Sequence, residues 1–98
     1  MPKLSADENH VASVKLFLAR AGINHLRVRK RGDLVVLESG PADDPMPRAR
    51  FRRDTVHLWT LEFATHTGRW EKTGYRDQLR SLLELVTTAF PWTIAPID

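Results

Sequence analysis

Hydrophobic residues near the N-terminus recur three and four positions apart, which is the spacing of a helix with one buried face. The residues "SADE" at 5–8 have the form of a capping box, in which Ser5 caps the helix and Glu8 reaches back to the free backbone N–H groups. Gly22 can adopt the left-handed conformation that commonly ends a helix. The pattern therefore predicts a helix over about residues 6–21. Its apolar stripe consists of Val11, Val14, Phe17, Leu18 and Ala21.

The segment before the C-terminus has the clearest helical pattern in the chain. A leucine-rich stripe recurs at helical spacing, and polar residues fall mostly on the other faces. Pro91 cannot continue a helix, so we expect it to end this one. We expect residues 1–5 and 93–98 to be loose tails, although Trp92 and Ile94 could pin the second tail to the core. The stripe consists of Leu79, Leu82, Leu83, Val86 and Phe90.

Between these helices, apolar and polar residues alternate, which is typical of half-buried strands. The stretch "HLRVRKRGDLVVLES" predicts a hairpin with its turn at "RGD", and "SGPADDPMP" contains too many prolines for regular structure. The stretches "RARFRRD" and "HLWTLEF" predict two more strands, and "RWEKTGY" predicts a fifth after the turn "ATHTG". Alternation places His57 and Trp59 on one inward face, and we also expect Trp70 to point inward.

The order of these elements is helix, about five antiparallel strands, helix. Short connections favour a meander, in which each strand pairs with the next one along the chain. The sequence therefore predicts an α+β fold that forms a single domain over residues 1–98. We expect both helices to cover one face of the sheet, and the other face to meet water or a partner.

Composition narrows the class of protein. The chain has 98 residues, a formal net charge of +3 and no cysteine, which excludes disulfides, thiolate metal sites and a cysteine nucleophile. The start "MPKLSADENH" has no apolar signal core, and no apolar run is long enough to span a membrane. We therefore expect a cytoplasmic protein that does not bind a membrane.

Arginine is concentrated in the middle of the chain. If the first strand and "RARFRR" belong to one sheet, alternation could bring their arginines to one face. An arginine row with aromatic residues nearby is one way to hold single-stranded nucleic acid. The alternative is a solvated face whose arginines pair with Glu38, Glu62 and Glu71 on neighbouring strands. The candidate nucleic-acid-binding residues are Arg27, Arg29, Arg48, Arg50, Arg52 and Arg53.

Residues 25–88 resemble a small bacterial family known only as a domain of unknown function. The resemblance rests on Pro47 and Ala49, on Trp59, on "THTG", on Trp70 and Tyr75, and on the helix "LRSLLELV". Two features depart from that family. Glu71 follows Trp70 where the family often has histidine, and the tail "FPWTIAP" replaces an acidic tail. The resemblance implies the same order of elements, and it gives no information about activity.

The sequence contains no motif of a catalytic, metal or cofactor site. Its four histidines, His10, His25, His57 and His66, are scattered, and no glycine-rich phosphate loop or nucleophile elbow is present. Asp43 and Asp44 could bind a cation weakly, but adjacent loop carboxylates are more often solvated. We therefore expect a non-enzymatic binding domain for nucleic acid. A protein-interaction or homodimerisation module, with an acidic protein among its possible partners, is the alternative.

Overall fold

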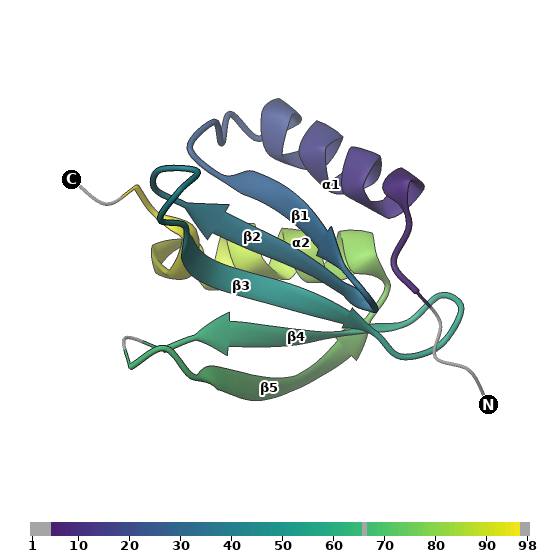
Figure 1. Ribbon diagram of the computed structural model, residues 1–98. Coiled ribbons are helices and arrows are strands. Elements are labelled where there is room, and N and C mark those ends of the chain that lie inside the picture. The colour runs from purple at the N-terminus through teal and green to yellow at the C-terminus, as the bar shows by residue number, and fades with distance from the viewer. Residues whose placement is uncertain (1–4, 66, 97–98) are drawn as a thin grey trace.

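The structure is a computed structural model that describes residues 5–65 and 67–96. Its elements follow the predicted order along the chain, a helix, then five strands that form one antiparallel sheet, then a second helix (Figure 1). The strands pair in sequence order, so the sheet is an open five-stranded meander. The elements are α1 (Glu8–Arg20), β1 (Arg27–Arg31), β2 (Leu34–Ser39), β3 (Met46–Arg53), β4 (Trp59–Ala64), β5 (Trp70–Asp77), α2 (Leu79–Ala89) and the 3₁₀ helix η1 (Pro91–Ile94).

The helix α1 begins later than the sequence predicts, because Asp7 rather than Ser5 is its N-cap. The carboxylate of Asp7 accepts hydrogen bonds from the backbone N–H groups of Asn9 and His10, at 2.8 and 3.2 Å. The ring nitrogen Nδ1 of His10 accepts the N–H of Asp7, which completes a capping box with histidine in place of Glu8. The predicted box was therefore wrong by two residues. The carbonyl of Ser5 instead accepts a hydrogen bond from Arg53.

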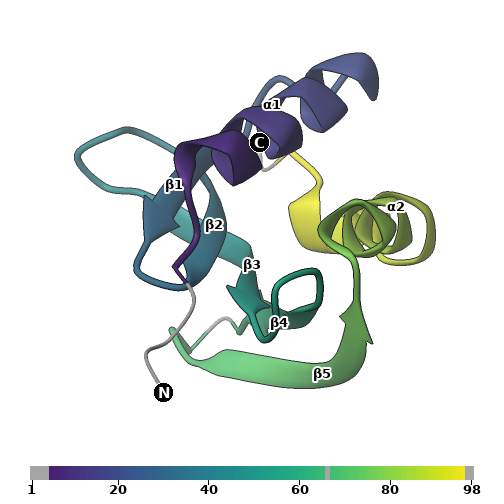
Figure 2. The ribbon, with the colours of Figure 1, turned by 90° about the vertical axis from the view of Figure 1, so that its right-hand side faces the viewer.

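Both helices cover the same face of the sheet, as predicted (Figure 2). The core lies between them and that face. The predicted alternation of inward and outward side chains along β3 and β4 is confirmed. Its inward positions, Ala49, Phe51, Trp59 and Leu61, all lie in the core. The helices contribute Val14, Leu18, Leu82, Leu83 and Val86.

The expected loose tail at 93–98 is anchored wherever the structure describes it. Pro91 ends α2, and η1 then turns back so that Ile94 is buried in the core. The carbonyl of Ile94 lies 2.5 Å from Nε2 of His25. Trp92 has the opposite placement, since it is 66% exposed. Of the two residues expected to pin the tail, only Ile94 does so.

Two other residues lie at positions that differ from those the sequence predicts. Trp70 pairs with Ala64 at a position where the side chains point away from the helices, so its expected inward placement is wrong. His57 lies before β4 rather than in it, and its side chain is exposed. His66 lies outside the described residues.

Candidate nucleic-acid interface

The face of the sheet that points away from both helices, here called the outer face, carries the candidate site. Strand pairing aligns its side chains in two rows that cross the sheet from β1 to β5. The first row contains Arg29, Val36, Arg50, Glu62 and Lys72, and the second contains Arg31, Leu34, Arg52, Thr60 and Arg76. Cationic side chains outnumber carboxylates in both rows.

Glu62 is the carboxylate of the first row. It is only 2% exposed although no helix covers this face. Its Oε1 accepts hydrogen bonds from Nε and Nη2 of Arg50 at 3.1 and 2.7 Å, and its Oε2 accepts one from Nε of Arg52 at 3.2 Å. The two arginines therefore neutralise one buried carboxylate.

The charges of this group depend on one another. Burial by itself would raise the pKa of Glu62, but the hydrogen bonds from Arg50 and Arg52 outweigh burial and hold the pKa below its ordinary value. Burial would lower the pKa of Arg52, and the bonds to Glu62 and Asp33 more than reverse that effect. Glu62 is therefore ionised at neutral pH and faces the guanidinium group of Arg52.

Arg50 and Arg52 are also held by neighbours other than Glu62. The guanidinium carbon of Arg50 lies 4.2 Å from the ring centroid of Trp70, which is a cation–π contact on the outer face. Nη1 of Arg52 lies 3.3 Å from Oδ2 of Asp33, in the turn between β1 and β2. The bonds of both arginines to Glu62 are part of the cross-strand pairing that the sequence left open as the alternative to ligand binding.

Arg48 does not share the outer face with Arg50 and Arg52, so that expectation is wrong. The pairing of β2 with β3 shifts by one residue between Leu37 and Glu38, and this bulge interrupts the alternation next to Arg48. Its guanidinium donates to the carbonyls of Thr93 and Ala95, at 3.0 and 2.8 Å. Arg48 is only 9% exposed, and it anchors the C-terminal segment.

Arg53 also lies off the outer face. It pairs with Trp59 of β4, whose side chain is in the core beneath α1. Its guanidinium donates to the carbonyls of Ser5 and Val56, at 2.7 and 3.0 Å. Arg53 therefore joins the segment before α1 to the loop between β3 and β4.

Arg27 and Arg29 lie on the outer face, as the alternation predicts. Both approach Glu38, at 3.9 and 4.0 Å, and Arg27 also donates to the carbonyls of Gly40 and Pro41. These ion pairs are longer than the hydrogen bonds of Glu62, and the side chain of Arg29 is 52% exposed. Arg29 is therefore more accessible than any arginine bound to Glu62.

Three cations and one aromatic residue of this face were missed by sequence reasoning. Arg31, Lys72 and Arg76 occupy its two rows, all exposed, and Trp70 lies beside the row of Arg50. Alternation in "RVRKR" already placed Arg31 with Arg29. Lys72 and Trp70 depended on the register between β4 and β5, which the sequence does not show.

No group of three metal-ligating side chains comes together among the described residues. Within the same ranges, no helix is long and apolar enough to cross a membrane. Comparisons with family models, curated proteins and solved structures found no match for this chain. The resemblance noted from the sequence therefore stays a prediction.

Proposed function

We propose that this domain is a non-enzymatic, cytoplasmic binding module whose outer sheet face binds single-stranded nucleic acid. The observation that carries the proposal is the place of Trp70. This indole lies on the uncovered face among cations, with Arg50 against its ring and Lys72 two residues along the same strand. Cationic side chains along the backbone and an aromatic ring under a base are the two parts of such a site.

In this proposal, phosphates contact the accessible cations and a base stacks near Trp70. Arg29, Arg31 and Lys72 supply the charge, since all three are exposed. Arg50 and Arg52 are already bonded to Glu62. These two arginines form the floor of the outer face, and Arg50 also holds Trp70 in place. Arg48 and Arg53 have no part in binding.

Fluorescence anisotropy with labelled single-stranded DNA, RNA and duplex DNA tests the proposal at low and moderate salt. We expect single strands to bind best, with an affinity that falls steeply as salt rises. The variant R29A/R31A/K72A should lose this binding. The matched control K15A/R20A/R80A removes three cations from the helix side and should keep it. Equal loss in both variants, or no binding at low salt, would overturn the proposal and leave the face to an acidic protein partner.

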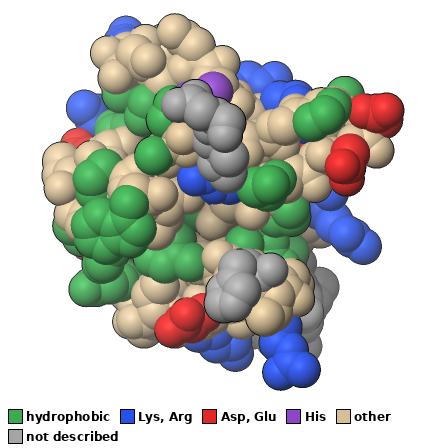
Figure 3. Space-filling view, turned by 90° about the vertical axis from the view of Figure 1, so that its left-hand side faces the viewer, with side chains coloured by type: hydrophobic (Ala, Val, Ile, Leu, Met, Phe, Trp, Pro, Cys, Tyr) green, Lys and Arg blue, Asp and Glu red, His purple; other side chains and the backbone are tan. Residues whose placement is uncertain are grey.

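Homodimerisation is a second candidate, favoured by an aromatic patch at the end of α2. The ring of Phe90 contacts those of Tyr75 and Trp92, at centroid distances of 5.7 and 5.6 Å. Figure 3 looks onto this end of the molecule and shows hydrophobic side chains gathered on its surface. Sedimentation of the wild-type protein and of W92S tests this candidate. A dimer that W92S dissociates would support it, and a monomeric wild-type protein would exclude it.

A further inference from the structure

A groove separates α1 from α2 on the side of the molecule opposite the outer face. It encloses about 700 Å³, within the range of small-molecule sites, which is about 300–1,000 Å³. Trp59 and Leu83 of the core form part of its lining, together with Phe17 of α1 and Leu79 of α2. The lining is therefore mainly apolar, although it opens to solvent.

Two apolar side chains that line this groove are exposed to solvent. Leu16 is 52% exposed and Val56 is 55% exposed, and both line the groove. Large apolar residues that are exposed together around a hollow indicate a binding surface more often than isolated ones do. An apolar ligand in the groove would cover both.

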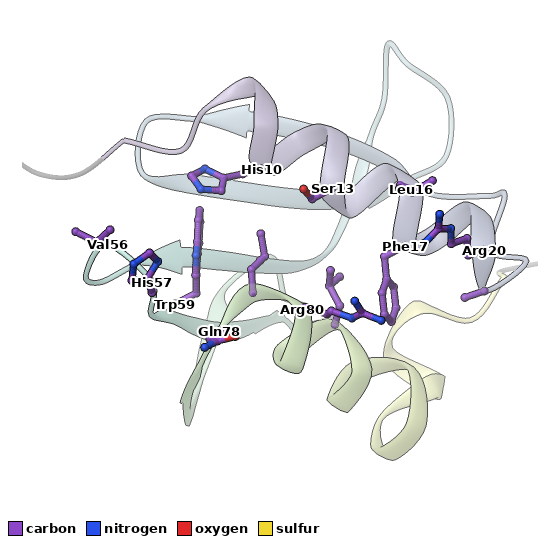
Figure 4. A pocket seen from close by; sticks show the side chains of 13 residues that line it. His10, Ser13, Leu16, Phe17, Arg20, Val56, His57, Trp59, Gln78 and Arg80 are labelled. Atoms are coloured by element: carbon purple, nitrogen blue, oxygen red, sulfur yellow. The ribbon is translucent and has the colours of Figure 1, made fainter.

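The charge carried by the described side chains that line the groove is positive. Among the described residues that line it there is no carboxylate, whereas Arg20 and Arg80 both line it. Figure 4 shows these two arginines toward the Phe17 end, and His10, His57 and Val56 toward the other end. Arg80 pairs with the exposed Glu84, at 3.4 Å, and this solvent-exposed pair is weak.

The groove is elongated. Its lining runs along α1 from His10 to Ala21, which corresponds to about 16 Å at the rise of an α-helix, 1.5 Å per residue. A ligand that matches it has a long apolar body and one anionic end. A compact or uncharged ligand would leave either the length or the two arginines unused.

We propose that this groove is a binding site for an elongated apolar anion of the class of medium-chain fatty acids. The chain lies along Phe17, Leu79 and Leu83, and the carboxylate accepts charge-assisted hydrogen bonds from Arg20 and Arg80. This site is separate from the outer face, so it does not depend on the proposed nucleic-acid function.

Titration calorimetry with dodecanoate, below its micelle concentration, tests this site, with dodecyltrimethylammonium as the cationic probe of equal chain length. We expect dodecanoate to bind with one-to-one stoichiometry, at least tenfold more tightly than the cation. The variant R20A/R80A should weaken dodecanoate at least tenfold. The control K30A/R69A, which removes two exposed cationic side chains outside the groove lining, should leave the affinity unchanged.

A second pair of variants tests the location. Ser13 is exposed on α1 and lines the groove, so S13W should block it, whereas the exposed Ala12 lies outside the lining and A12W should bind as the wild type does. Equal affinity for the two probes, unchanged binding by S13W, or no binding of dodecanoate would overturn the proposal. Binding of an acidic amphipathic peptide in place of dodecanoate would also overturn it, and would assign the groove to a partner helix.

Discussion

Nη2 of Arg50 lies 2.7 Å from Oε1 of Glu62, a carboxylate that is buried on the face of the sheet that no helix covers. The arginines above it account for this burial. Their guanidinium groups donate hydrogen bonds to the carboxylate, and the apolar Val36, which pairs with Arg50 on the same face, is only 6% exposed. The outer face thus contains an ion-pair network of Arg50, Arg52 and Glu62, and further exposed cationic side chains surround this network.

Removing the carboxylate of Glu62 should destabilise the fold. The change E62Q leaves Arg50 and Arg52 without their counter-charge, and breaking a buried ion pair in this way costs about 3 kcal/mol or more. Urea unfolding measures the free energy. E71Q, at an exposed position of β5, is the control and should change stability by less than about 0.5 kcal/mol. Similar small effects for both variants would show that the network is only a surface feature.

The same carboxylate predicts how stability changes in acid. Because the pKa of Glu62 in the folded protein lies below its ordinary value of 4.5, its stabilising contribution is complete above that value. The contribution is lost as pH falls through the lower folded-state pKa. The difference in unfolding free energy between wild type and E62Q should therefore shrink in acid. A difference that stays constant from neutral pH into that range would contradict the assigned charge state.

Arg48 should act on stability and not on nucleic-acid binding. R48A removes charge-assisted donors from the carbonyls of Thr93 and Ala95, at a cost of about 2 kcal/mol. Carboxypeptidase should then digest the C-terminal segment faster than in wild type. R69A removes an exposed arginine from the turn between β4 and β5, and should affect neither measurement. Loss of nucleic-acid affinity in R48A without loss of stability would return Arg48 to the binding face.

The two strand tryptophans should respond differently to truncation. W59A removes a side chain that is 2% exposed and should cost about 3–5 kcal/mol. W70A removes a half-buried ring whose contact with Arg50 is worth about 1 kcal/mol, so it should fold almost as stably as wild type and bind single strands more weakly. Thermal unfolding compares the variants. Equal losses of stability would mean that Trp70 is a core residue.

Alternation predicted much of the fold because one face of each central strand is buried. It placed Ala49, Phe51 and Trp59 inward, and it also implies that Arg53, two residues after Phe51, points inward. The same alternation therefore already separates Arg53 from Arg50 and Arg52.

The errors lie where local pattern does not determine structure. The bulge beside Arg48 arises from a shift in strand pairing between β2 and β3, and the place of Trp70 depends on the register of β5 against β4. Ser5 and Asp7 are both good helix caps, and only the folded geometry shows that Asp7 receives the N–H groups. The groove between the helices depends on how far apart they pack, which neither stripe encodes.

The central claim, that single strands bind the outer face, is tested most directly by NMR of the ¹⁵N-labelled protein titrated with a single-stranded oligonucleotide. The indole N–H of Trp70 and the amides of Arg29, Arg31 and Lys72 should shift in proportion to the oligonucleotide bound. The indole N–H of Trp59, in the core, should stay in place. Shifts confined to α1 and α2, or an unmoved Trp70 indole at saturation, would contradict the claim.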